Sequence, residues 1–239
     1  MNDFWIVLLV AGLAWAQTKR PVDEGMTSLG PVRLTVINHA SLMIEAGGQV
    51  VHVDPWSQGN YEGLPKADLL LLTDIHVDHL DAKMIERLKK PGIVIIGPEA
   101  VATQLAGTTV MKNGDAKTVG PWTIEAIPMY NIKRGPSAGE VFHLKGRGNG
   151  YVLGFGGSRF YIAGDTENIP EMRALKNIDV AFVCMNLPYT MSPEEAAEAV
   201  RAFHPKVVYP YHYRGSDLSV FQKALAGTGV DVRIRDWYY

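Results

Sequence analysis

The chain has 239 residues, of which 47% are hydrophobic and 20% are charged, and its formal net charge is −2. This length and composition fit a globular protein of one large domain or two small ones with a substantial core. The small net charge, with acidic and basic residues interspersed, argues against nucleic acid or an anionic membrane as a partner. The single cysteine, Cys184, excludes an internal disulfide, and its apolar neighbours favour a buried side chain.

The chain begins with an apolar run, FWIVLLVAGLAWA, at residues 4–16. It has the length of a signal-peptide core, is short for a membrane span, and ends in the small-x-small pattern AWA. The charges that flank this run are the reverse of those in a usual signal peptide, because Lys19 and Arg20 follow it and no basic residue precedes it. We expect residues 1–16 to be a signal peptide or anchor and 17–31 a linker. The protein would then be periplasmic or secreted; membrane anchoring through the apolar run, or a cytoplasmic protein, is the alternative.

A strand pattern then occurs twice along the chain. ASLMIEAGGQVVHVDP predicts two strands around a Gly-Gly turn, ending at Asp54. GYVLGFGGSRFYIAGD predicts the same arrangement, ending at Asp165. Paired glycines between alternating apolar residues favour a hairpin, because such turns need positive φ angles.

In each half a strand, a helix and a second strand follow the hairpin. The strands LLLLT and VAFVC begin after Asp68 and Asp179. The helices DAKMIERLKK and SPEEAAEAVRAF are expected to begin at the N-caps Asp81 and Ser192, the second with a capping box. The closing strands are GIVII and KVVYP. Two such copies predict an α/β fold, a four-layer αβ/βα sandwich of two pseudo-duplicated halves over residues 32–239.

Polar residues gather where the predicted strands end. They are Asp74 to His79 after LLLLT, Asp165 to Glu167 after FYIAG, and His212 after KVVYPY. Loops at one edge of such a sandwich converge from distant parts of the sequence. Histidine and carboxylate ligands suit zinc, manganese or iron. The sequence therefore predicts a metal site at this edge.

The loop TDIHVDHLD has enough ligands for two metals. Asp74 and His76 are two residues apart and can point to the same side, whereas Asp78 and His79 would serve a neighbouring position. The alternative is that Asp78 and Asp81 cap a helix and the histidines are ordinary surface residues.

With this loop the chain resembles the metallo-β-lactamase superfamily, whose pattern is His-x-His-x-Asp-His after a strand. The segments INHASLMIE, VDPW, AGDTE and PYHY stand in the expected order, and the resemblance covers the chain from about residue 32. It is greatest toward the branch with the predicted metal-dependent hydrolases, L-ascorbate-6-phosphate lactonase and the phospholipase D that releases N-acylethanolamines. The resemblance implies the αβ/βα fold and a hydrolase.

The resemblance also implies a ligand set for two divalent metal ions, zinc or else manganese or iron. The expected ligands are His76 and His143 for the first ion, Asp78, His79 and His212 for the second, and Asp165 as a bridge between them. For His143, which stands in VFHLKGRGNGY, an ordinary strand histidine is the alternative.

Asp74 departs from the family pattern, because it stands where the family has its first histidine. A carboxylate can still bind a metal, so we expect Asp74 to be a ligand and to favour manganese or iron over zinc. The alternatives are a residue beside the ligands or a general base.

The implied mechanism is hydrolysis by a hydroxide that bridges two ions about 3.5–4 Å apart, with its pKa brought down to about 7. The hydroxide attacks a carbonyl carbon or a phosphorus, and the ions stabilise the oxyanion. Asp78 would accept a proton, and Tyr189 would donate a hydrogen bond to the substrate. His39 would orient a ligand or contact the substrate. Core packing for Tyr189 and a structural role for His39 are the alternatives.

The expected substrate is a small-molecule phosphodiester, lactone or related ester, on the branch resemblance alone. A nuclease is disfavoured because no RNA-binding domain or basic run is present, and a β-lactamase because Asp74 and GDTE differ from that branch. The competing class is a non-catalytic metal- or ligand-binding protein on the same scaffold. KGRGNG lacks the spacing of a P-loop, so a flexible connection is expected, with Lys145 and Arg147 near an anionic substrate as the alternative.

Overall fold

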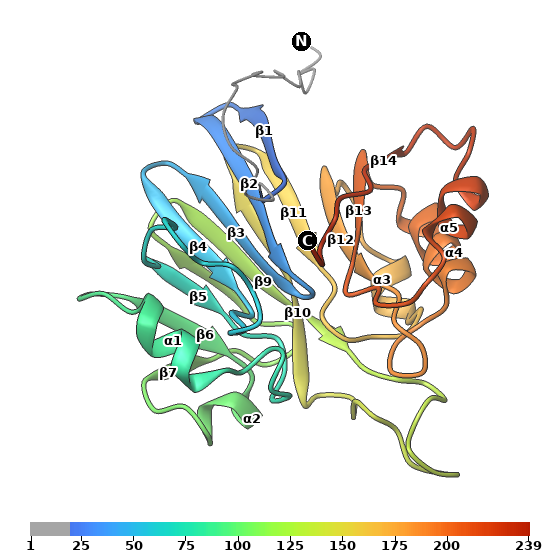
Figure 1. Ribbon diagram of the computed structural model, residues 1–239, viewed down its shortest axis with the longest axis horizontal. Helices are drawn as coiled ribbons and strands as arrows, with labels where there is room; N and C mark the ends of the chain where they lie inside the picture. The colour runs from blue at the N-terminus through green and yellow to red at the C-terminus, as the bar shows by residue number, and fades with distance from the viewer. Residues whose placement is uncertain (1–19) are drawn as a thin grey trace.

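The computed structural model describes residues 20–239, which form two seven-stranded sheets packed face to face (Figure 1). The first sheet has, in spatial order, β1 (Val22–Thr27), β2 (Gly30–Asn38), β3 (Ser41–Ala46), β4 (Gln49–Val53), β5 (Leu69–Leu71), β6 (Val94–Gly97) and β7 (Thr108–Val110). The second has β14 (Asp231–Val232), β13 (Val207–Tyr211), β12 (Val180–Cys184), β11 (Ser158–Ile162), β10 (Gly148–Phe155), β9 (Trp122–Met129) and β8 (Ala116–Val119).

Helices cover the outer sides of this pair of sheets, as Figure 1 shows. On the first sheet these are α1 (Ala82–Leu88) and α2 (Glu99–Ala102). On the second they are α3 (Pro170–Arg173), α4 (Pro193–Phe203) and α5 (Leu218–Ala224). The predicted αβ/βα sandwich is therefore confirmed.

The two halves have the same topology, as the repeated sequence pattern predicted. Strands β1 to β4 are antiparallel and β4 to β7 are parallel; β8 to β11 are antiparallel and β11 to β14 are parallel. The hairpin turns are at Gly47-Gly48 and Gly156-Gly157, and all four glycines have positive φ. Parallel strands that leave each hairpin in one direction end at a common edge, and this edge carries the polar clusters.

The four consecutive leucines at the end of β5 are explained by burial on both faces of the strand. Leu69 and Leu71 belong to the core between the sheets. Leu70 and Leu72 belong to a second core beneath α1, with Ile85 among its members. Because successive side chains of a strand point to opposite faces, a strand buried on both sides has no polar position until it ends.

The helix N-termini are capped as expected. The Asp81 carboxylate accepts hydrogen bonds from the backbone N–H groups of Lys83 and Met84. Ser192 and Glu195 form a reciprocal capping box at α4. Cys184 is fully buried, as its apolar neighbours predicted.

The predicted linker at residues 17–31 needs correction. VDEGMT forms β1, and β2 begins at Gly30, so both strands belong to the first sheet from Val22 onward. The alternation of exposed and buried residues in β1 is that of an edge strand with one face on the core. The expected signal peptide or anchor, residues 1–16, lies outside the described residues and stays a prediction. Among residues 20–239, no helix is long and apolar enough to span a membrane.

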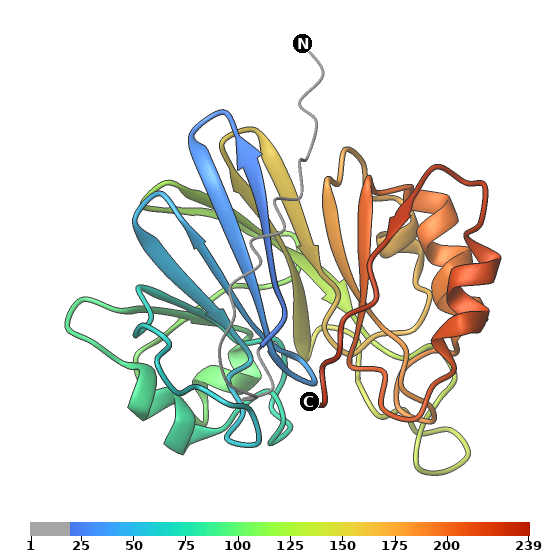
Figure 2. The same ribbon diagram turned by 45° about the horizontal axis from the view of Figure 1, so that its top comes forward.

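The C-terminal segment joins the two sheets. It descends beside β13 to end near the turn between β2 and β3 (Figure 2). The guanidinium of Arg235 binds both carboxylate oxygens of Asp23 on β1, at 2.9 and 2.7 Å. Trp237 is fully buried, and the Tyr239 hydroxyl donates to the backbone oxygen of Val36. The last residues of the chain therefore fix the first sheet against the second.

Candidate metal centre

Five segments meet at the edge where the strands end. They are the loop after β5 with Asp74, His76, Asp78 and His79, the loop between β9 and β10 with His143, and the residues after β2, β11 and β13, which are His39, Asp165 and His212. All are at least 95% buried except His76, whose side chain is 43% exposed, and Asp78, at 24%. The segment 74–79 is thus brought together with partners that lie far away in sequence.

The backbone is strained where three of these strands end. His39, Asp54 and His212 have φ angles of 52°, 42° and 46°, in the left-handed region that few residues other than glycine adopt. Each such residue costs about 1–3 kcal/mol, and clusters of them are typical of functional sites. This conformation turns the chain sharply at the strand end.

Asp165 lies at the centre of the cluster. Its Oδ2 is 3.4 Å from both His79 Nε2 and His143 Nε2. Its Oδ1 is 3.3 Å from His212 Nε2. One carboxylate therefore faces three imidazoles from three segments, which is the position that the sequence predicted for a bridging ligand.

The remaining ligand atoms fall into groups on either side of Asp165. Asp74, His76 and His143 offer atoms that all lie within 4.8 Å of one another, as do His79, Asp165 and His212. Asp78 joins the second group, with its Oδ2 3.4 Å from His212 Nε2 and 3.8 Å from His79 Nε2. Within the first group, Asp74 Oδ2 is 2.9 Å from His76 Nδ1 and 3.8 Å from His143 Nε2.

His39 belongs to this cluster as well. Its Nε2 is 3.2 Å from Asp78 Oδ2, and its ring stacks near that of His212 at 3.7 Å between centroids. On the other side, His39 Nδ1 is 2.7 Å from the Tyr238 hydroxyl. The structure thus places His39 beside Asp78 and His212, and its orienting role stays a prediction.

Five buried atoms of the expected ligands make no hydrogen bond within residues 20–239. They are the Nε2 atoms of His79, His143 and His212, Nδ1 of His212, and Oδ1 of Asp165. A buried polar atom without a partner costs about 1–3 kcal/mol. Metal coordination satisfies imidazole nitrogens and carboxylate oxygens at once. The residues present therefore fit divalent metal ions.

The electrostatics of the cluster support a cation. Burial disfavours ionisation of Asp165, but the imidazoles of His212 and His79 hold its pKa well below its usual range. At His79, burial is outweighed by the carboxylates of Asp165 and Asp54, which raise its pKa well above its usual value. Burial also opposes ionisation of Asp74, yet a hydrogen bond from the neighbouring imidazole lowers its pKa to about 2. The carboxylates of Asp165 and Asp74 are therefore ionised at neutral pH and need positive charge beside them.

Two of the ligand histidines are held by buried polar partners that the sequence analysis missed. His79 Nδ1 is 2.8 Å from Asp54 Oδ2, and Asp54 also accepts from the N–H and hydroxyl of Thr73. His143 Nδ1 is 2.6 Å from Asn131 Oδ1. Such contacts fix the ring orientation and tautomer of a metal-binding histidine. The repeat held a signal for Asp54, because it ends the first hairpin as Asp165 ends the second.

Arg147 is a further residue whose contact with the site the sequence analysis missed. Its guanidinium donates hydrogen bonds to both carboxylate oxygens of Asp74. Nε donates to Oδ1 at 3.1 Å, and Nη2 donates to Oδ2 at 2.9 Å. The segment KGRGNG is a turn at residues 145–147 that leads into β10 at Gly148, and its expected flexibility stays a prediction.

Tyr189 borders the site and is not a core residue. Its side chain is 48% exposed and packs edge-on against Phe142, at 5.1 Å between ring centroids. Its backbone oxygen accepts a hydrogen bond from Asn131 Nδ2. Other exposed apolar side chains stand on the same loops, namely Val77, Ile132, Leu144 and Leu187. The site is thus bordered by apolar surface.

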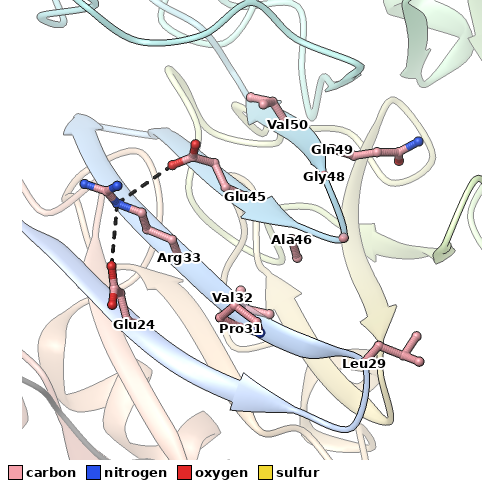
Figure 3. Close-up of a pocket in the computed structure, with 11 residues that line it drawn as sticks. Glu24, Leu29, Pro31, Val32, Arg33, Glu45, Ala46, Gly48, Gln49 and Val50 are labelled. Atoms are coloured by element: carbon pink, nitrogen blue, oxygen red, sulfur yellow. Dashed lines mark ion pairs between the residues drawn. The ribbon is translucent and has the colours of Figure 1, made fainter.

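A separate hollow of about 590 Å³ lies on the first sheet, near the hairpin turns at the opposite strand ends (Figure 3). Arg33 stands in it between Glu24 and Glu45, at 4.0 and 3.8 Å. The side chains of Arg33, Glu24 and Glu45 are 53%, 59% and 32% exposed, so these ion pairs are weak. No histidine, cysteine or aspartate among the described residues lines this hollow, so it lacks the ligand types of the metal centre.

Comparisons with known proteins agree with the fold. Residues 33–212 match the model of the β-lactamase superfamily domain. A UPF0173 metal-dependent hydrolase from Thermococcus kodakarensis is 31% identical over 195 residues, which cover 76% of this chain and 84% of the relative.

Two solved structures superpose closely on this chain. A candidate metal-dependent hydrolase from Parabacteroides distasonis has a TM-score of 0.86 and 43% identity, covering 91% of this chain and 99% of its own. Igni18, a metallo hydrolase from Ignicoccus hospitalis, has a TM-score of 0.71 and 24% identity, covering 86% of this chain and 95% of its own, and shows the shared fold. The chain therefore belongs to the metallo-β-lactamase superfamily, in the branch that contains the UPF0173 metal-dependent hydrolases.

Proposed function

We propose that this protein is a metal-dependent hydrolase that binds two divalent ions, zinc or else manganese or iron, and cleaves a small-molecule phosphodiester, lactone or related ester. The convergence of three buried imidazole nitrogens on Asp165, none of them hydrogen-bonded within residues 20–239, carries the proposal. Relatives that are named metal-dependent hydrolases support the reaction class.

The ligands of the two ions would come from the two groups around Asp165. One group is Asp74, His76 and His143, and the other is Asp78, His79 and His212, with Asp165 shared between them. When bound, the ions supply Lewis acidity toward a carbonyl or phosphoryl oxygen and lower the pKa of a water molecule to about 7.

Asp78 and His39 are the residues of this chain that we assign to proton handling. Burial opposes ionisation of Asp78, but the imidazoles of His79 and His212 hold its pKa well below its usual range, so Asp78 is an ionised carboxylate at neutral pH. We assign it as the acceptor of a proton from an attacking water because it lies among the ligands, not because of its basicity. Burial lowers the pKa of His39 to about 4, which leaves the imidazole neutral at pH 7. With Nδ1 beside the Tyr238 hydroxyl and Nε2 beside Asp78, His39 orients this carboxylate.

Tyr189 and the apolar border would contact the substrate. The exposed Tyr189 side chain can donate a hydrogen bond from its hydroxyl while its ring packs on Phe142. Exposed apolar residues around a polar centre favour substrates that carry an alkyl or aryl group beside the scissile bond. The compounds that test the function should include such groups.

The proposal is tested by measuring bound metal and turnover together on the same protein. Elemental analysis of protein reconstituted with Zn²⁺ or Mn²⁺ should give two ions per chain. The turnover panel consists of an aryl phosphodiester, an aryl ester and a γ-lactone. Asp165→Asn should lose bound metal, and both Asp165→Asn and His76→Ala should lose at least about 100-fold in kcat/KM, since each removes a ligand.

His204→Asn is the matched control, because His204 ends α4 in a left-handed conformation that asparagine also tolerates, away from the cluster. It should keep both metal and turnover. Two bound ions without turnover of any compound in the panel would contradict the hydrolase and indicate a binding protein. Activity that survives Asp165→Asn would contradict the assigned site.

A further inference from the structure

The Asp74–Arg147 ion pair sets the two ligand groups apart. Among residues 20–239, Arg147 is the one guanidinium that pairs with an expected metal ligand. The Asp74 side chain is fully buried and that of Arg147 is 20% exposed. Two parallel hydrogen bonds between a guanidinium and a carboxylate are among the strongest pairings in proteins.

The backbone after Arg147 packs closely against the strand end before Asp74, which brings the two side chains together. The N–H of Asn149 donates to the carbonyl oxygen of Thr73, at 2.9 Å, which aligns the start of β10 with the start of the metal-binding loop. A Cβ atom on Gly148 would lie 2.9 Å from that oxygen and 2.6 Å from Cε of Met129. Only glycine allows this approach, so the sequence RGNG places Arg147 directly opposite Asp74.

The pairing changes the charge of the first ligand group. Asp74 contributes one negative charge, His76 and His143 are neutral when they bind a metal, and Arg147 contributes one positive charge. These charges sum to zero. Among the described residues no lysine or arginine pairs with the group around Asp165 and Asp78, so this group keeps two carboxylate charges when its histidines are neutral and bind a metal.

We infer that Asp74 and Arg147 act as one neutral ligand unit, and that this unit makes the Asp74–His76–His143 group the weaker of the two ion positions. Both oxygens of Asp74 already accept hydrogen bonds from Arg147, whereas Oδ1 of Asp165 accepts no hydrogen bond within residues 20–239. A divalent ion near a guanidinium is also repelled by it. The tighter ion therefore fills the position at Asp165 first. The inference rests on the proposed two-ion site.

A double-mutant cycle tests this unit by titration with Zn²⁺ against a chromogenic chelator. Arg147→Gln frees the carboxylate, so the weaker ion should bind at least about tenfold more tightly, which is about 1.4 kcal/mol. Asp74→His leaves an unpaired guanidinium, so the weaker ion should bind at least about tenfold less tightly. The double variant, D74H/R147Q, restores a neutral ligand set and should bind within about threefold of the wild type.

Stability of the metal-free protein gives an independent readout. Arg147→Gln should unfold at a lower urea concentration than the wild type, because it leaves a buried carboxylate without its partner, and should gain more stability on addition of Zn²⁺. If this variant does not fold, Arg147→Lys keeps the charge, and its weaker ion should bind within about threefold of the wild type. The control is Arg159→Gln, which breaks a similar pair with Glu125 in the second sheet and should change neither affinity.

Equal affinity of the weaker ion in the wild type and Arg147→Gln would overturn the inference, as would equal affinity in Asp74→His and the double variant. A tight ion lost in Asp74→His would also overturn it. Absence of bound Zn²⁺ from all four proteins would refute the proposed function itself, so the two failures can be told apart.

Discussion

At the scale of single residues, the centre depends on side chains that hold the ligands rather than on the ligands alone. Asp54 accepts from Thr73 through both oxygens and faces His79 Nδ1, all within the core. With Nδ1 held by Asp54, the Nε2 atom of His79 faces Asp165 and is the atom that would bind a metal. The left-handed backbone conformation of Asp54 contributes to this arrangement, because it turns the chain directly after β4.

We expect Asp54→Asn to lower metal affinity by about 10–100-fold, because the amide cannot accept from His79 while it also binds Thr73 as the carboxylate does. Zn²⁺ competition with a chromogenic chelator measures the effect. Asp68→Asn is the control, since Asp68 caps the N–H of Val50 and pairs with Lys90 outside the site. An unchanged affinity in Asp54→Asn would show that His79 needs no such support.

His52 gives a prediction about pH away from the metal. It is fully buried, its Nε2 is 3.0 Å from the carbonyl oxygen of Pro65, and burial lowers its pKa to about 4 from 6.5. The unfolded chain then binds a proton at a higher pH than the folded one, so this stability is present above pH 6.5 and is lost as the pH falls toward 4. Between pH 7.5 and 4.5 the wild type should lose about 2 kcal/mol more than His52→Gln in urea unfolding. Parallel losses in the two proteins would contradict this account.

At the scale of elements, the C-terminal segment has more influence than its position suggests. Trp237 packs against Phe182 and Tyr211 of the second sheet. Its backbone oxygen accepts from the N–H of His39, and the next residue, Tyr238, reaches the His39 ring. One segment thus supports both the core and the site.

We expect Trp237→Ala to destabilise the protein by about 3–5 kcal/mol, the usual cost of a large buried aromatic ring. Chemical unfolding of the metal-free protein measures this cost. Tyr189→Ala is a suitable comparison, because its ring is half exposed and its loss should cost about 1 kcal/mol or less. A cost at Trp237 as small as that at Tyr189 would mean that the segment does not hold the sheets together.

Elements with local signals were predictable from the sequence, and contacts between distant elements were not. The hairpins at Gly47-Gly48 and Gly156-Gly157 and the cap at Ser192 depend on residues only a few positions apart. Arg147 and Asp74 are 73 positions apart, and His39 and Tyr238 are 199 apart. Periodicity and spacing do not report such pairs, because only the packed sheets bring them together.

At the scale of the whole molecule, the duplicated topology explains why a site exists at this edge. Each half sends strands in one direction from its hairpin, and each contributes ligands where those strands end: the loop after β5 in the first half, Asp165 and His212 in the second. The ligand set is complete only when the two sheets pack. Metal binding should therefore stabilise the interface between the halves as well as the site.

The most direct test is anomalous diffraction from crystals of the full chain grown with Zn²⁺ or Mn²⁺. Two peaks are expected, one among His79, Asp165 and His212 and one among Asp74, His76 and His143, separated by about 3.5–4 Å. Weaker occupancy is expected at the second of these positions, beside Arg147. Crystals with no anomalous peak among these residues at excess metal, or with ions bound only elsewhere, would contradict the account.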